Sequence, residues 1–111
     1  MLKVLEKESK NNLLNYHLQP SLLNVFIFKD GDRFCAKCIE LDLITEMDTS
    51  QGALQAIVEM IKEYTQDYMA RIDIFSKSPN RYHHLPYIER IAKCKDEWEI
   101  LEQIEVKYGH I

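Results

Sequence analysis

The chain has 111 residues, a length that suits one domain and hardly two. Apolar residues make up 46% of it and charged residues 29%, a balance that excludes a disordered tail, a collagen-like fibre and a membrane-embedded protein. The formal net charge is −4, so the overall field does not favour nucleic-acid binding. Composition therefore indicates a soluble α/β or α+β domain and says nothing about its chemistry.

The start of the chain has no targeting pattern. Its first ten residues include acidic side chains and contain no apolar core of signal-peptide length. The longest apolar runs span only four residues, far short of a bilayer. We therefore expect a cytoplasmic protein with no membrane partner, in which the three cysteines do not build a disulfide framework.

Three strands are predicted in the first half of the chain: Leu22–Phe28, Arg33–Ile39 and Leu41–Met47. The Asp30-Gly31 pair between the first two is a strong hairpin signal. Three alternating residues of the second strand share one face: Phe34, Ala36 and Cys38. Because the links are short, the three strands are expected to form an antiparallel meander.

A long amphipathic helix is predicted to follow the strands. Apolar residues recur at helical steps: Ala53, Ile57, Met60, Ile61, Tyr64, Tyr68, Ile72 and Phe75. Asp48-Thr49-Ser50 supplies an N-cap, and Ser78-Pro79-Asn80 ends the helix. One continuous helix of this length, about 40 Å, would extend beyond a three-stranded sheet. Its last turns are therefore expected to pack on the C-terminal third.

The C-terminal third is expected to be helical. Pro86 can open a helix over Tyr87–Cys94, and Asp96 with Glu99 can start another that Gly109 ends. A strand remains the alternative for the last part, because Ile104, Val106 and Tyr108 alternate.

The chain divides into an N-terminal extension (1–21), a core (22–76) and a C-terminal extension (77–111) packed on the core. In the first of these, Leu13, Leu14 and Leu18 suggest a helical turn that Pro20 breaks.

Two clusters have side chains used in catalysis or metal binding. Cys35 and Cys38 have the spacing of half a zinc site, but residues three apart in a strand point to opposite faces. His83-His84 has neither a positioned partner nor a pocket that the sequence reveals, and a docking loop is the simpler interpretation. We therefore expect no catalytic residue, no metal site and no cofactor, although a metal protein or enzyme built on these clusters remains an alternative.

The stretch from Phe34 to Tyr64 resembles the HicB-like antitoxin family, and the resemblance extends over residues 22–72. In that family an aromatic-x-Ala-x-Cys strand leads through Glu-Leu-Asp to a capped amphipathic helix that ends in Tyr. The matching residues are Phe34, Ala36, Cys38, Glu40, Leu41, Asp42, Thr45, Asp48, Thr49, Ala53, Leu54 and Tyr64. The departures are Met47 and Gly52 around the cap and Ile39 after the cysteine.

The resemblance implies a partial ribonuclease-H-like β-β-β-α fold without catalytic carboxylates. It also implies an antitoxin, or an orphan relative, that neutralises a small RNA-cleaving toxin of the HicA type by protein–protein binding. The family's C-terminal DNA-binding segment is not expected here, because residues 96–111 hold five acidic residues against Lys107. The alternative function is a stand-alone homo-oligomeric scaffold or ligand-binding module on the same fold.

An acidic surface is the predicted partner-binding site. Four residues around the third strand share one side by alternation: Glu40, Asp42, Glu46 and Asp48. A toxin that cleaves RNA needs basic residues on its working face, so matching carboxylates would steer the encounter. The alternative is that these carboxylates only keep an exposed face of the sheet hydrated and bind no partner. A homodimer or higher oligomer is also expected, because so small a sheet has exposed edges.

Overall fold

The hairpin predicted at Asp30-Gly31 forms between the first two strands. In the computed structural model, which describes residues 22–109, β1 (Leu23–Asp30) pairs antiparallel with β2 (Arg33–Cys38). Only two residues separate the strands, and Gly31 has a φ of 62°. A two-residue hairpin needs this positive φ at its first central position, which glycine adopts without steric cost.

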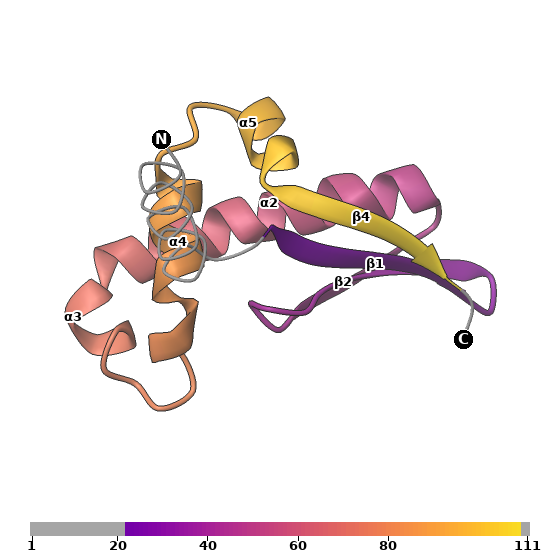
Figure 1. Cartoon of the computed structure of the whole chain (residues 1–111). Coiled ribbons are helices and arrows are strands. Elements are labelled where there is room, and N and C mark those ends of the chain that lie inside the picture. The colour runs from indigo at the N-terminus through magenta and orange to yellow at the C-terminus, as the bar shows by residue number, and fades with distance from the viewer. Residues whose placement is uncertain (1–21, 110–111) are drawn as a thin grey trace, which may run out of the picture.

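The sheet has four strands, one more than predicted. β3 (Leu43–Met47) pairs antiparallel with β2, as the meander prediction requires. β4 (Ile104–Gly109) pairs parallel with β1, so the strand order is β3-β2-β1-β4 and the sheet is mixed. The α+β class is confirmed, and the sheet limited to three antiparallel strands is wrong. Figure 1 shows β4 beside β1, both running in the same direction.

The last part of the described chain forms a short helix and then a strand, so each of the two alternatives predicted for it is correct over part of its length. Asp96 accepts a hydrogen bond from the Glu99 amide and caps α5 (Glu97–Glu102), as predicted. The helix ends before Ile104, and the alternating residues that follow form β4. The all-helical extension up to Gly109 is therefore wrong. Pairing with β1 satisfies backbone groups at the edge of the sheet, which outweighs the helical spacing of a few residues.

Helix α2 (Ser50–Ala70) covers one face of the sheet (Figure 1). Thr49 caps it by accepting from the Gly52 amide at 2.9 Å, which confirms the predicted N-cap. Ile57 and Ile61 are fully buried with Ala36 and Cys38 of β2. The predicted apolar face of the helix and the strand face that carries Ala36 and Cys38 therefore form the core together.

The prediction of one continuous helix to Phe75 is wrong. Helix α2 ends at Ala70, where Arg71 leaves the helical region with φ −125° and ψ 34°, and a short helix α3 (Ile72–Phe75) follows. The Arg71 amide still donates to Asp67 and Tyr68 oxygens, so the break satisfies the end of α2. The apolar spacing continues across it because Phe75 packs on Tyr68, with ring centroids 5.4 Å apart.

The remaining helices pack on the second half of α2. The 3-10 turn η1 (Tyr82–His84) leads into α4 (Leu85–Ala92), where Pro86 occupies the first turn as predicted. Ile88 and Ile91 of α4 are buried in the same core cluster as the apolar residues of α2.

Among residues 22–109, no helix has the length and apolarity needed to cross a membrane. The helical turn predicted at Leu13–Leu18 lies outside the described residues.

Candidate functional site

The four predicted carboxylates do not lie on one continuous strand face. Strand β3 begins at Leu43, so Glu40 and Asp42 lie in the turn that precedes it. Glu46 lies near the opposite end of β3, and Asp48 follows the strand. The structure therefore divides the acidic surface into two pairs at the two ends of β3.

Glu40 is committed to holding the turn against β1. Its Oε1 accepts from the Asn24 amide at 2.7 Å, and its Oε2 accepts from Asn24 Nδ2 at 2.6 Å. The Ile39 amide also donates to the Asn24 carbonyl at 3.0 Å. Glu40 thus positions the turn, and its carboxylate is largely engaged inside the molecule.

Glu46 and Asp48 share one cation, Arg33 of β2. Arg33 Nε lies 3.2 Å from Glu46 Oε1, and one terminal nitrogen lies 2.7 Å from Asp48 Oδ1. The other terminal nitrogen donates to the Glu46 carbonyl at 3.0 Å. The side chains remain 47% to 87% exposed, so the pairs add little stability and stay accessible to a partner.

Asp42 is the predicted carboxylate with an unengaged side chain. It has a φ of 53°, the left-handed conformation that aspartate tolerates better than most residues. Within residues 22–109, its carboxylate makes no hydrogen bond or ion pair, and the residue is exposed. The turn therefore presents this charge to solvent.

Asp42 lies on the rim of a groove of about 750 Å³ between the β2–β3 turn and the second half of α2. The loop before α4 closes the other side of this groove. Its polar lining residues are Glu40, Asp42, Tyr64, Asp67, Asn80, Arg81, His83 and His84. Tertiary folding thus joins two of the predicted carboxylates to the His83-His84 loop, which the sequence did not connect with them.

The inner wall of the groove is tied together by aromatic residues. His84 is only 4% exposed, and its Nδ1 lies 2.6 Å from the Tyr64 hydroxyl. The Tyr68 hydroxyl donates to the Arg81 carbonyl at 2.9 Å. The Arg81 guanidinium lies over the Phe75 ring, 4.4 Å from its centroid, a favourable cation–π distance.

The protonation of this wall suits recognition. Burial lowers the pKa of His84, and His83 and Arg81 lower it further, so the imidazole is neutral near pH 7. Burial also raises the pKa of Tyr64. A neutral imidazole paired with a neutral phenol presents polar atoms without charge, while Asp42 supplies negative charge at the rim. Asp67 also lines the groove and shares its charge with Arg71, whose Nε lies 3.6 Å from Asp67 Oδ1. This arrangement can receive a basic or polar side chain of a partner.

Sequence reasoning missed Tyr64 and Asp67 as members of this site. The sequence places Tyr64 among the apolar residues of the long helix, and no pattern in it singles out Asp67. Their spacing of three places them on one helix face, which is a signal that the sequence contains. What the sequence lacks is the position of the loop that comes to face them.

The cysteines of β2 point to opposite faces of the sheet. Cys35 pairs with Glu46 across the ladder, whereas Cys38 pairs with Leu43 and lies in the core. Burial raises the pKa of Cys38 to about 11, so its thiol stays protonated. Over the described range, 22–109, no group of three His, Cys, Asp or Glu side chains has an arrangement that could hold a metal ion.

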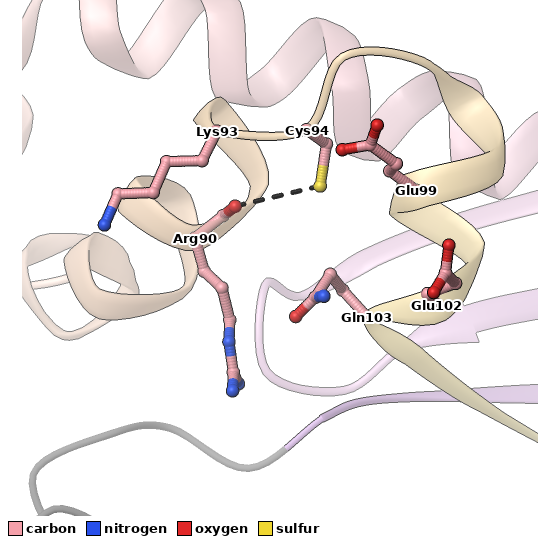
Figure 2. A pocket seen from close by; sticks show the side chains of 6 residues that line it. All are labelled: Arg90, Lys93, Cys94, Glu99, Glu102 and Gln103. Carbon is pink, nitrogen blue, oxygen red and sulfur yellow. Dashed lines mark hydrogen bonds between the residues drawn. The ribbon is translucent and has the colours of Figure 1, made fainter.

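A second hollow of about 510 Å³ lies between α4 and α5 (Figure 2). Its lining residues are Arg90, Lys93, Cys94, Glu99, Glu102 and Gln103. Cys94 Sγ donates to the Arg90 carbonyl at 3.8 Å, the contact drawn in Figure 2. Burial raises the pKa of Cys94, and the nearby carboxylates of Glu99, Asp96 and Glu102 raise it further. This thiol is therefore a poor nucleophile.

Comparison with known proteins assigns the class. Residues 2–106 match the PHD-like family, described as the antitoxin of RelE/RelB toxin–antitoxin systems. The chain belongs to this antitoxin family. The antitoxin class expected from the HicB-like resemblance is thus confirmed, under a different family name.

One solved structure supports the fold. It is described as the antitoxin part of a proposed toxin/antitoxin system from Syntrophomonas wolfei subsp. wolfei. The TM-score is 0.72 at 24% identity, over 88% of this chain and 71% of that one. At this identity the likeness is one of fold. Among curated proteins no match was found.

Proposed function

We propose that this antitoxin neutralises a small, basic, RNA-cleaving toxin by binding it through the acidic residues at the two ends of β3. The observation that carries the proposal is Asp42, whose exposed carboxylate lies on the rim of a groove without an intramolecular partner in the described residues. Family membership supplies the class of partner, because the family's description names a toxin–antitoxin system.

Charge complementarity explains why carboxylates suit this role. An RNA-cleaving toxin must attract phosphates, so its working face carries Lys and Arg. Carboxylates that match this face accelerate encounter and reject wrong partners more than they add affinity. Asp42 and Asp67 offer negative charge beside the groove, and Glu46 and Asp48 offer it at the other end of β3.

The four carboxylates are expected to contribute unequally. Asp42 loses no internal contact when a toxin side chain approaches, so its charge is available at once. Glu46 and Asp48 must share their charge between Arg33 and the partner. Glu40 acts by positioning the turn, because both of its oxygens already bind Asn24.

The toxin type is the finer part of the proposal. The HicB-like resemblance implies a toxin of the HicA type, and the family match names RelE/RelB systems. A toxin of either type fits the proposed chemistry, because the acidic surface requires only a small partner with a basic face. We also propose that the chain alone does not bind DNA specifically, because the acidic residues in and around α5 repel phosphates.

Binding experiments with RelE-type and HicA-type toxins, offered in turn, test the proposal. Asp42→Asn removes one charge and keeps a residue that tolerates the left-handed conformation. Asp32→Asn, in the β1–β2 turn, is the matched control. We expect binding that weakens severalfold in Asp42→Asn, stays unchanged in Asp32→Asn, and falls with added salt.

Other outcomes would contradict the proposal. If neither Asp42→Asn nor added salt changes the binding affinity, the acidic residues do not form the interface. A failure to bind toxins of either type would favour the stand-alone module instead.

A further inference from the structure

Strand β4 leaves one row of backbone groups facing outward. The Leu23 amide donates to the Gln103 carbonyl at 3.0 Å, and Leu23 is in register with Ile104. In a parallel ladder, alternate residues of one strand bond to its neighbour. The odd-numbered residues of β4 therefore bond to β1, while the amides and carbonyls of Ile104, Val106 and Tyr108 point away from the sheet.

This outward row is self-complementary about Val106. If two β4 strands run antiparallel with Val106 opposite Val106, Ile104 of each copy lies opposite Tyr108 of the other. All of these residues have outward-facing backbone groups, so about six hydrogen bonds can form between the copies. The pairing thus uses only the backbone groups of β4 that the β1–β4 ladder leaves without a partner among the described residues.

The charges of β4 select the same register. With Val106 at the centre, Glu105 of each copy lies opposite Lys107 of the other, in the non-hydrogen-bonded positions where side chains are closest. Shifting the partner by two residues in one direction places Glu105 opposite Glu105. Shifting it in the other direction places Lys107 opposite Lys107. Both shifted registers bring like charges together, so one register is favoured.

The apolar face of β4 gains from the same pairing. Tyr108 is 69% exposed in the single chain, although it lies on the α2 side of the sheet with Ile104 and Val106. In the paired arrangement, each exposed Tyr108 ring lies opposite Ile104 of the other copy, on the same face of the joined sheet. The opposite edge strand, β3, carries Glu46 and no basic residue, so self-pairing there offers no pair of opposite charges between the copies.

We propose that two copies of this chain associate through β4 into one continuous eight-stranded sheet, centred on Val106. Residues directly opposite in an antiparallel pair point to the same face. Both α2 helices therefore cover the same side of the joined sheet, and the two β3 edges lie at its far ends. Figure 1 shows β4 as the outer strand of the sheet in the single chain.

Val106→Pro tests the edge. Its amide faces outward, so proline removes a contact between copies and spares the β1–β4 ladder, as proline does on natural edge strands. Sedimentation of the full chain should give about 26 kDa for the wild type, twice the 13.2 kDa monomer. The variant should sediment as a monomer at micromolar concentration, with an unchanged circular dichroism spectrum.

Charge reversal tests the register. Glu105→Lys and Lys107→Glu should each weaken the dimer at least fivefold, because each creates two repulsive pairs across the two-fold axis. An equimolar mixture of the two single variants should dimerise again, because Lys then faces Glu at every position. Lys77→Glu, far from β4, is the control and should leave the dimer unchanged.

Each result decides the proposal. A wild-type monomer across the concentration range would overturn it, and so would a dimer that survives Val106→Pro with a folded spectrum. If Val106→Pro does not fold, the charge variants decide, since both lie on the exposed face of β4. Equal dimerisation of the single variants and their mixture would overturn the Val106-centred register.

Discussion

The Tyr64 hydroxyl lies 2.6 Å from Nδ1 of His84 and joins α2 to the loop before α4. The two rings meet nearly edge to face, with an interplanar angle of 78°. Because the imidazole is neutral near pH 7, one hydrogen bond links the groups in either tautomer. This contact fixes the wall of the groove on which Asp42 lies, and two predictions depend on it.

Tyr64→Phe should destabilise the fold by about 1–3 kcal/mol, because it leaves the buried Nδ1 of His84 without its partner. Urea unfolding at pH 7.5 measures the effect. Tyr82→Phe is the control, since Tyr82 is 58% exposed, and it should change stability very little. Equal small losses in both variants would mean that the Tyr64–His84 contact contributes nothing.

Stability should fall as the pH drops below about 6.5 because of His84. Burial, His83 and Arg81 lower its pKa in the folded state, while Asp42 acts in the opposite direction more weakly. The unfolded chain titrates near the ordinary value of 6.5, so below that pH it binds more protons than the folded chain. Stability is therefore retained above pH 6.5 and lost progressively toward the lowered pKa.

Urea unfolding at pH 7.5, 6.5 and 5.5 measures this dependence. His84→Asn is the comparison, because its amide can still hydrogen-bond to Tyr64 and does not titrate in this range. We expect a steeper loss of stability between pH 6.5 and 5.5 in the wild type than in the variant. Parallel profiles would assign the acid sensitivity to other groups.

Ile61→Ala should cost about 2–5 kcal/mol of unfolding free energy. Ile61 is fully buried in the core between α2 and the sheet, so its removal leaves a cavity that neighbours fill only in part. Lys62→Ala, on the exposed side of the same helix, controls for helix propensity and should change stability by less than about 0.5 kcal/mol. A loss that small for Ile61→Ala would contradict the packing of this helix face.

Thr49 and Gly52 should show coupled effects on stability. Thr49→Ala should cost about 1 kcal/mol, because the Gly52 amide loses its cap. A Cβ at residue 52 would lie 3.0 Å from Thr49 Oγ1, so Gly52→Ala in the wild type forces the cap to move. In the Thr49→Ala background that conflict is absent, and Gly52→Ala should stabilise by about 0.5–1 kcal/mol.

A double-mutant cycle in urea measures this coupling. The prediction requires Gly52→Ala to be more favourable in the Thr49→Ala background than in the wild type. Additive effects within about 0.3 kcal/mol would show that the cap hydroxyl adapts to the added methyl group.

The local parts of the fold were readable because their signals lie within a few residues. The Asp30-Gly31 turn, the Thr49 cap and the burial of Ile57 and Ile61 each follow from spacing of two to four residues. The helix break at Arg71 escaped the same reasoning. Apolar residues keep helical spacing on both sides of it, so periodicity alone contains no sign of the change in direction.

Strand alternation around the candidate site predicts some of its geometry. Alternation correctly separates Leu43, Thr45 and Met47 from Ile44 and Glu46 on β3. It was extended too far at the start, because Asp42 adopts a left-handed turn conformation and breaks the alternation. The division of the four carboxylates between Asn24, Arg33 and solvent depends on contacts between different strands, which a single strand pattern does not encode.

The sequence by itself determined the strand faces, the capped amphipathic helix and the acidic character of the middle of the chain, because side-chain periodicity and capping are local. Only the tertiary structure decided that β4 joins β1, that the His84 loop closes a groove beside Asp42, and which carboxylates remain free. These features bring together segments from distant parts of the chain. They depend on which backbone groups and apolar faces are still unsatisfied once the local elements have formed.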